Sequence, residues 1–417
     1  MPILNKRTAS RFDLNHLELR QNPGSAFSKI LERGPVFQSR LPIMGTSWVA
    51  TSWEAVSETL RNTQDFVRDP RIAGRKNQIW IQRILPRKFK RLFLNNMLTR
   101  DGQDHRRLRT LVSQAFQRQN INHMEKRIEA IAIQHLQGME SDLENPAGGI
   151  DFISGFCRPF PLAVICELLG LPESDRPKFM HWFSGMSRVR SATGILKLLP
   201  MMNRTLNYLE EQFALVRKHP RPGLITSLVE AEAEGERLQK DELLSTALLL
   251  LLAGHETTLH LLSNSLLTLL QLEDEKVALT RDWSQAPATI DEILRWTSVI
   301  HVAKPRFVNR DREFHGQRLS RGEIIIPCLG SANFDPQEFV EPTQFQRNRS
   351  PNRHMTFGSG PHVCLGMNLA LTEARIALRA IFEKWPHLDI AFNLEKPDFG
   401  RRIGMRTLNT LLLNPNP

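Results

Sequence analysis

Most of the chain shows hydrophobic residues at the spacing of helices. Between residues 104 and 118, apolar residues recur with the 3.6-residue period of one helix face. They are Leu108, Leu111, Val112, Ala115 and Phe116. Asp101 is the expected N-cap of this helix, and Asp104 stands three residues later, where a capping box has its second member. Further helices are predicted over 125–137, 205–218, 288–297 and 367–384.

The segment 241–270 has a different pattern, because leucine occurs on every side of the predicted helix. A helix that is hydrophobic all round is buried in the protein interior. At 1.5 Å per residue its length would be about 45 Å. The sequence therefore predicts one long helix that crosses the middle of the molecule.

Strand patterns occur in only two regions, 36–51 and 323–329. Between 330 and 363 the chain is rich in Asn, Pro, Gly and Ser and is expected to be irregular coil. Long coil in a compact protein usually carries function. We expect a mainly α fold with a small β-rich lobe (α+β).

Composition narrows the function classes. The 417 residues are 41% hydrophobic and 24% charged, which is ordinary for a globular protein. The net charge of +11 favours acidic partners or anionic membrane surfaces. Basic and aromatic residues are scattered rather than clustered, so nucleic-acid binding is not expected.

The cysteines and the apolar runs bear on the cell compartment. Cys157, Cys166, Cys328 and Cys364 form no CxxC pair, so a zinc ribbon or a disulfide framework is not expected. The N-terminal residues carry charges throughout, without the apolar core of a signal peptide. The longest apolar run, 247–254, is too short to cross a bilayer. We therefore expect a soluble cytoplasmic protein.

The strongest chemical signal is FGSGPHVCLG, residues 357–366. Its glycines, at 358, 360 and 366, allow a flat ligand to approach the backbone closely. Cys364 stands just before a predicted helix, whose amide groups and dipole are expected to lower the thiol pKa. A thiolate in this setting can bind haem iron.

A second signal is AGHETT, residues 253–258, within the long apolar helix. Glu256 and Thr257 are costly to bury there without a partner or a task. Gly254 removes side-chain bulk where the helix could widen beside a ligand. The motif is not a zinc protease HExxH, because residue 259 is leucine. His255 and His260 lie about 140° apart around a helix, which is poor geometry for one metal ion.

Together these motifs resemble the cytochrome P450 family over nearly the whole chain. The FxxGxHxCxG loop matches at Phe357, Gly360, His362, Cys364 and Gly366. The resemblance implies haem b (iron protoporphyrin IX) with Cys364 as the axial ligand of the iron. It places Phe357, Gly358 and Gly366 around the cofactor and His362 at a haem propionate.

The resemblance also assigns roles to other residues. AGHETT looks like the family's oxygen-activation motif, so Ala253 would lie at the haem, Glu256 would deliver protons and Thr257 would support the bound oxygen. The HxxxR pattern of His105 and Arg109 borders an apolar helix face, where haem propionates would compensate the positive charge. Arg306 likewise matches a propionate-binding arginine.

Glu292 and Arg295 resemble the family's buried ExxR pair. Such a pair is weak evidence alone, because Glu234 and Arg237 have the same spacing in a segment that reads as exposed. The position of 292–295 before the Cys364 loop favours a structural lock, with Arg347 or Arg349 as its third member. Phe334 departs from the family pattern, since bacterial members usually have arginine there.

The implied architecture is a single cytochrome P450 domain over 1–417, with haem between the long helix and the Cys364 loop. The β-rich lobe is expected near 36–51 and 299–329, and the helical haem-binding core over 95–297 and 350–390. The implied reaction inserts one oxygen atom from O2 into an organic substrate, by hydroxylation or epoxidation. Electrons would come from NAD(P)H through a separate ferredoxin or flavodoxin system. A peroxide-driven peroxygenase and a non-enzymatic haem sensor stay as alternatives.

The sequence indicates a lipophilic substrate. Leu249, Leu250, Ala253 and Val302 are expected in the pocket, beside two apolar segments at 79–94 and 179–202. The first segment also carries Arg83, Arg87, Lys88, Lys90 and Arg91, and no acidic residue. This mixture suits a fatty acid, terpenoid or polyketide with an anionic end, or an entrance that contacts anionic lipid peripherally.

Overall fold

The structure is a computed structural model, which describes residues 12–14, 16–41, 44–75, 96–119, 121–140, 149–183, 192–233, 238–391 and 397–415. The segment predicted at 79–94 lies outside the described residues, and so do Glu234 and Arg237.

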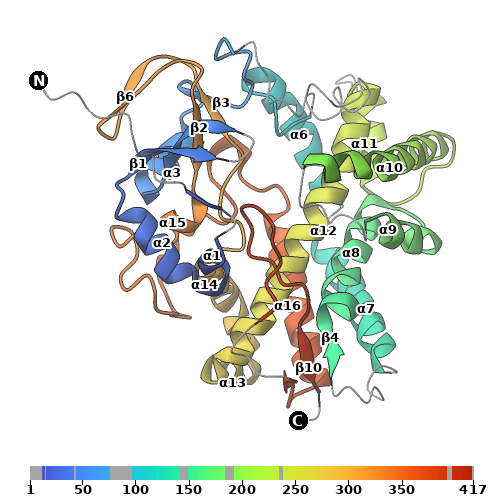
Figure 1. Cartoon of the computed structure of the whole chain (residues 1–417). Helices are drawn as coiled ribbons and strands as arrows, with labels where there is room; N and C mark the ends of the chain where they lie inside the picture. The colour runs from blue at the N-terminus through green and yellow to red at the C-terminus, as the bar shows by residue number, and fades with distance from the viewer. Residues whose placement is uncertain are drawn as a thin grey trace, which may run out of the picture.

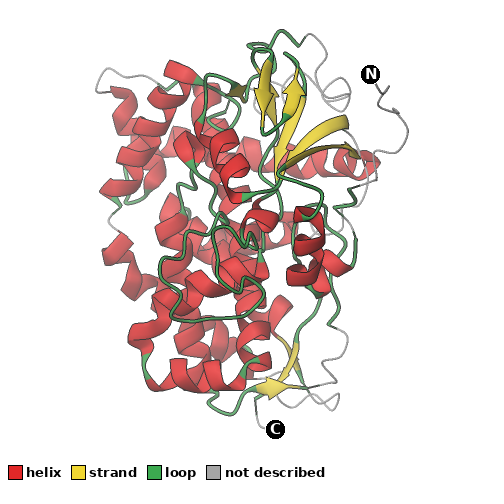
Figure 2. Ribbon diagram, turned by 90° about the vertical axis from the view of Figure 1, so that its left-hand side faces the viewer, coloured by secondary structure: helices red, strands yellow, loops and turns green. Residues whose placement is uncertain are grey.

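Helices make up most of the molecule, as predicted (Figures 1 and 2). Their bounds are α1 Glu18–Gln21, α2 Pro23–Leu31, α3 Trp53–Arg61, α6 Gly102–Arg118, α7 Ile121–Gly138, α8 Pro159–Leu169, α9 Arg176–Phe183, α10 Ala192–Lys218, α11 Leu224–Ala233, α12 Lys240–Gln271, α13 Glu273–Arg281, α14 Ala286–Thr297, α15 Leu329–Ala332 and α16 Met367–Lys384. A π-helical turn spans Ile153–Cys157, and short 3-10 helices span Glu173–Asp175, Trp283–Gln285 and Gly360–His362.

The long predicted helix is α12, which has 32 residues and runs through the middle of the molecule (Figure 1). It begins with a capping box, in which the backbone N–H of Gln239 donates to the Glu242 carboxylate at 2.8 Å. It packs against α8, α10, α14 and α16, so its leucines are buried on several sides. Ala253 and Thr257 are exposed because they line a cavity.

The β-rich lobe lies beside this helical body (Figure 2). Its strands are β1 Val36–Leu41, β2 Gly45–Ala50, β3 Phe66–Val67, β5 Arg306–Val308 and β8 Ile324–Pro327. They form one sheet in the order β1-β2-β8-β5-β3, in which only β2 and β8 pair in parallel. The sheet thus joins the two predicted strand regions, with Val49 opposite Ile326. The mainly α fold with a small β lobe is confirmed.

The individual strands of two small sheets were not predicted, although the first sheet lies within the expected β-rich region 299–329. The strands β6 Arg312–Phe314 and β7 Gln317–Leu319 form a hairpin. The strands β4 Ile150–Asp151, β10 Leu412–Asn414 and β9 Asp389–Ile390 form a three-stranded sheet. Strands of two or three residues are too short to show an alternating pattern in the sequence.

Some local predictions were wrong. Asp101 is the N-cap residue of α6, but its side chain caps nothing there. Its carboxylate instead accepts hydrogen bonds from the backbone N–H groups of Arg68 and Asp69, at 2.7 and 2.8 Å. A capping box with Asp104 therefore does not form. The helix predicted over 205–218 is the second half of α10, which continues through Pro200.

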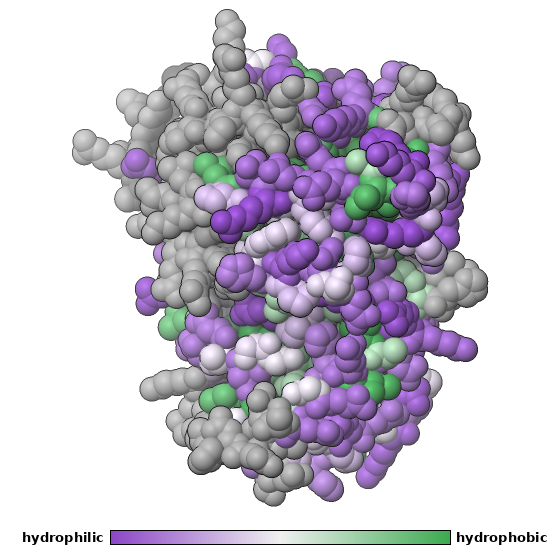
Figure 3. Space-filling model, turned by 90° about the vertical axis from the view of Figure 1, so that its right-hand side faces the viewer, coloured by the Kyte–Doolittle hydropathy of each residue, from purple (hydrophilic) through white to green (hydrophobic). Residues whose placement is uncertain are grey.

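The face of the molecule in Figure 3 is largely hydrophilic where it is described. On the face formed by the side of α9, α10 and α11, hydrophobic residues form small separate patches between polar ones (Figure 3). Within the described part of the chain, no helix is both long enough and apolar enough to cross a membrane.

Candidate active site

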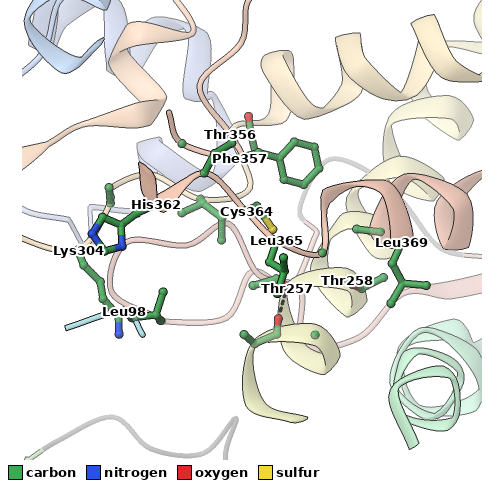
Figure 4. Close-up of a pocket in the computed structure, with 18 of the residues that line it drawn as sticks. Leu98, Thr257, Thr258, Lys304, Thr356, Phe357, His362, Cys364, Leu365 and Leu369 are labelled. Carbon is green, nitrogen blue, oxygen red and sulfur yellow. Dashed lines mark hydrogen bonds between the residues drawn. The ribbon is translucent and has the colours of Figure 1, made fainter. Parts of the chain in front are cut away.

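A cavity lies between the middle of α12 and the loop that carries Cys364 (Figure 4). The α12 wall contributes Leu249, Leu250, Ala253 and Thr257, and Val302 lies on another wall. The residues predicted for the substrate pocket therefore all line one cavity together with Cys364. The cavity lining is mostly apolar, which suits a lipophilic ligand.

The Cys364 loop is held in place by its backbone. The N–H of Cys364 donates to the carbonyl of Phe357 at 2.9 Å, and that of Gly358 donates to Met355 at 2.7 Å. Gly360 has φ +70°, and a Cβ there would lie 2.7 Å from the carbonyl oxygen of Leu60 in α3. Only glycine tolerates both the positive φ and the close backbone contact, and it therefore allows the loop to pack closely against α3.

Cys364 differs from the other three cysteines. Cys157, Cys166 and Cys328 are buried, and burial raises the pKa of each thiol. Cys364 is exposed to the cavity, and Figure 4 shows its sulfur pointing into it.

The expectation of a lowered Cys364 pKa is wrong for the protein groups alone. Burial raises the pKa of Cys364, and the Gly366 N–H and the Arg109 charge only partly oppose this effect. Burial is therefore the larger of these effects on the thiol.

Thr257 faces the same cavity from α12. Its hydroxyl donates to the carbonyl of Ala253, one turn earlier, at 2.5 Å (Figure 4). Gly254 packs against Ile165 of α8. A Cβ at this position would lie only 3.2 Å from the Ile165 side chain, so the close packing depends on glycine. Gly254, which was predicted to leave room beside a ligand, lines the cavity and also lets α8 lie close to α12, while Thr257 stays accessible.

The side chain of Glu256 does not point into the cavity. Its carboxylate forms an ion pair with Arg402, and Glu256 is absent from the described cavity lining. Arg402 follows α16 by eighteen residues and comes from the irregular C-terminal segment. Sequence analysis missed this partner, because nothing in the spacing of 256 and 402 links them. The acid and the alcohol therefore occupy different sides of α12.

Polar side chains cluster at one edge of the cavity. The rings of His105 and His362 lie 4.0 Å apart between centroids, and His362 Nε2 is 4.0 Å from the Asp101 carboxylate. Desolvation lowers the pKa of His362 to about 4, and burial also lowers the pKa of His105. His105 Nε2 and His362 Nδ1 are buried without a hydrogen-bond partner in the described structure.

Two arginines lie near this edge. Arg109 lines the cavity, and burial lowers its pKa. Arg306, in β5, is 1% exposed, and none of its three guanidinium nitrogens has a hydrogen-bond partner among the described residues. Arg306 is not itself part of the described cavity lining. A buried guanidinium without an acceptor is costly, so an anion is the natural complement.

These residues fit haem. Cys364 supplies the sulfur at the cavity wall, and the unpartnered nitrogens of Arg306, His105 and His362 supply donors for carboxylates. A Cβ built at Gly366 meets nothing within 4 Å, so this part of the wall leaves room for a flat ring. Within the described residues, no three His, Cys, Asp or Glu side chains gather as a metal site. A zinc centre therefore has no support there.

The pair of Glu292 and Arg295 in α14 is fully buried and forms a network. Arg295 donates to both Glu292 oxygens, at 2.7 and 2.8 Å, and to the carbonyl of Asn333 at 2.9 Å. The structure places Arg349 at 3.2 Å from Glu292, whereas Arg347 pairs with Glu275. This geometry resolves the choice between the two arginines.

Phe334 takes part in the same network. Its ring lies 5.6 Å below the Arg295 guanidinium and stacks on Phe27, with centroids 5.9 Å apart. A neutral aromatic face here supports the Arg295 cation without adding a second positive charge. The departure at this position therefore has a packing role.

Sequence analysis also missed three residues with ionisable side chains in the cavity wall, Arg68, Lys304 and Glu373. Glu373 is 3% exposed, and burial raises its pKa well above the usual value. Arg68 and Lys304 stand in ordinary sequence contexts, where a basic residue usually faces solvent. Only the fold brings them to the cavity.

Known proteins are similar to this chain in sequence and structure. A profile described as "Cytochrome P450" matches residues 195–389. The chain is 33% identical to the polyketide biosynthesis cytochrome P450 PksS of Bacillus subtilis, over 94% of this chain and 96% of PksS. The solved structure of PksS has a TM-score of 0.86 and 31% identity, covering 97% of this chain and all of that chain.

Two further solved structures contain acyl ligands. P450BioI in complex with an acyl carrier protein ligated to hexadec-9Z-enoic acid has a TM-score of 0.82 and 28% identity, covering 95% of this chain and 99% of that chain. The myxobacterial CYP267B1 in complex with myristic acid has a TM-score of 0.85 and 30% identity, covering 96% of this chain and 98% of that chain.

Proposed function

The chain belongs to the cytochrome P450 family of oxidoreductases, and from this premise we propose that it inserts one oxygen atom from O2 into a lipophilic organic substrate by hydroxylation or epoxidation. The observation that carries the proposal is the placement of Cys364 and Thr257 on the walls of one cavity (Figure 4). Cys364 can hold a haem iron, and Thr257 presents a hydroxyl to the space beside that iron.

The chain's own residues would hold haem b at this site. Cys364 would ligate the iron, and His105, Arg109, Arg306 and His362 would bind the propionates. When bound, the haem supplies O2 activation, which a thiolate ligand favours by donating electron density. Phe357, Gly358, Gly366 and Ala253 would complete the surroundings of the ring.

Thr257 and Glu256 would move protons. The Thr257 hydroxyl, which donates to Ala253, can turn to donate into the cavity. Glu256 is adjacent in sequence and is held by Arg402, whose side chain is 33% exposed and links the acid to solvent. Although the two side chains lie on different sides of α12, we propose that Glu256 is the acid that takes protons from solvent and replaces those used at the Thr257 hydroxyl.

The presence of both Glu256 and Thr257 favours the monooxygenase over the two alternatives. A peroxygenase driven by peroxide needs no such proton path, and a haem sensor needs neither residue. Electrons would come from NAD(P)H through a separate ferredoxin or flavodoxin.

The substrate would be medium to large and lipophilic. The cavity wall around Leu249, Leu250 and Val302 is apolar, and Met97, Leu98 and Phe116 extend it. PksS is named for polyketide biosynthesis, and the two other similar structures contain hexadecenoic or myristic acid. A long-chain acyl compound or a polyketide is therefore the first class to test.

The test compares turnover of the same substrate under two regimes. We expect product with NADPH and a surrogate ferredoxin system under O2, and little product with hydrogen peroxide alone. Equal or better turnover on peroxide alone would favour the peroxygenase. Ligand binding without turnover under either regime would favour the sensor.

A further inference from the structure

The cavity wall carries more positive charge than a haem would neutralise. Its described lining includes the cations Arg68, Arg109 and Lys304, and its one acid, Glu373, is buried with a raised pKa. Arg306 adds a further unpartnered cation nearby. The two haem propionates would balance two of these four charges, and even with the nearby Asp101 carboxylate a surplus of positive charge remains.

Arg68 is one of the surplus cations. It follows β3 directly, and its Nε and Nη1 atoms are buried without a hydrogen-bond partner in the described structure. Asp101 is the nearest acid that influences it, but one Asp101 oxygen already accepts two backbone hydrogen bonds, from Arg68 and Asp69. Two of its three guanidinium nitrogens therefore lack an acceptor among the described residues.

Lys304 is the second surplus cation. It forms no salt bridge with any described residue, and Figure 4 shows it beside Leu98 and His362 at one end of the cavity. Desolvation and the charge of Arg68 lower the pKa of Lys304 to about 8, so the ammonium is still mostly charged at neutral pH. The segment 76–95 carries six basic residues and no acid, so it offers no carboxylate to neutralise either cation.

The surplus lies next to apolar surface. Leu98, Val302 and Ala303 line the cavity around Lys304, and the chamber continues to Leu249 and Thr257 on α12. An anion held at Arg68 and Lys304 would thus anchor one end of a molecule whose apolar part extends towards the oxidation site.

We propose that Arg68 and Lys304 form a carboxylate-binding subsite, so that the preferred substrate is a free acid with a long apolar chain. This inference rests on the proposed function, because it concerns how the substrate of that cavity is recognised. Charge-assisted hydrogen bonds at a partly desolvated site are strong enough to select an acid over its ester.

The experiment measures equilibrium affinities for haem-loaded protein by calorimetry and by the haem spin-state shift. The ligands are dodecanoic acid, methyl dodecanoate and dodecanol. The variants are Arg68→Met and Lys304→Met, with Lys29→Met as a control that removes a surface charge and Arg306→Met as a reference for a lost propionate partner. Haem content is measured for each.

We expect the parent protein and Lys29→Met to bind the acid at least about tenfold more tightly than the ester. Arg68→Met and Lys304→Met should each weaken acid binding by about tenfold and leave ester and alcohol binding unchanged. The inference is overturned if acid and ester affinities change together, or if haem is lost as in Arg306→Met, since both cations would then serve the propionates.

These outcomes are separable from the proposed function. An acid preference that disappears in the variants supports the subsite even if no product forms with O2 and electrons. Efficient oxidation of neutral compounds without any acid preference would overturn the subsite and leave the monooxygenase proposal standing.

Discussion

We expect oxygen activation in this site to depend most on Thr257. Its hydroxyl is accessible to the cavity and bonds only to the carbonyl of Ala253 among the described residues. Thr257→Ala should keep haem and substrate binding, because the methyl group still fits the wall, but it removes the donor. We expect more peroxide and less product per NADPH.

The matched control for this change is Thr258→Ala. Thr258 also lines the cavity, but it is 3% exposed rather than open to it. Product yield and peroxide are measured for parent and both variants with one substrate. Equal coupling in Thr257→Ala and the parent would contradict the role of the hydroxyl.

At the residue scale, the sequence predicted the positions that a motif contains and missed those that only folding brings together. Cys364, Thr257 and Val302 reach one cavity as expected. Arg402 could not be found, because it is a single basic residue distant in sequence from Glu256. Lys304 stands two residues after Val302, but nothing in the sequence indicated that its charged side chain lines the cavity. The choice of Arg349 over Arg347 depended on loop geometry that spacing does not encode.

The Cys364 loop is the element whose shape decides whether haem can bind. Gly360→Ala should destabilise it, because a φ of +70° and a backbone oxygen at 2.7 Å both oppose a Cβ. The conformational part alone costs about 1–2 kcal/mol. Chemical unfolding of the variant should show this loss of stability.

Gly366→Ala gives the complementary result at the other end of the loop. Gly366 has negative φ, and a Cβ there meets no protein atom within 4 Å. The protein should therefore unfold at the parental denaturant concentration when free of haem, while haem uptake is weakened by the methyl group at the cavity wall. Full haem affinity in this variant would show that the ring does not lie against Gly366.

The network around α14 is a second element-scale test. Glu292→Gln leaves Arg295 and Arg349 buried without their carboxylate, and breaking a buried pair typically costs about 3–5 kcal/mol. The control is Glu383→Gln, which breaks the pair with Arg379 on α16, where both side chains are more than half exposed. That loss should be about 0.5 kcal/mol or less. Similar unfolding midpoints for both variants would refute a structural lock.

Helices were predicted better than strands for a physical reason. A stripe with a 3.6-residue period over four or five turns, as in α6, is a long signal. The strands β4, β9 and β10 have two or three residues and owe their existence to partners far along the chain. The Asp101 cap failed for a related reason, because the two residues that follow β3 bind its carboxylate through their backbone N–H groups.

At the scale of the whole molecule, charge should govern the encounter with a redox partner. The net charge is +11, and Arg61 and Arg106 are exposed on α3 and α6, which flank the Cys364 loop. First-electron transfer from an acidic ferredoxin or flavodoxin should slow steeply with added salt, since charges are screened within about 8–10 Å at ordinary ionic strength. A flat salt dependence would contradict electrostatic steering.

The whole account depends on Cys364 as the ligand of a haem iron, and the carbon-monoxide spectrum of the reduced protein tests this most directly. The parent protein should show the red-shifted Soret band of a thiolate-bound haem. Cys364→Ser should lose that band, while Cys328→Ser, which changes a buried cysteine away from the cavity, should keep it. A thiolate band that survives in Cys364→Ser would contradict the assignment and the reaction proposed from it.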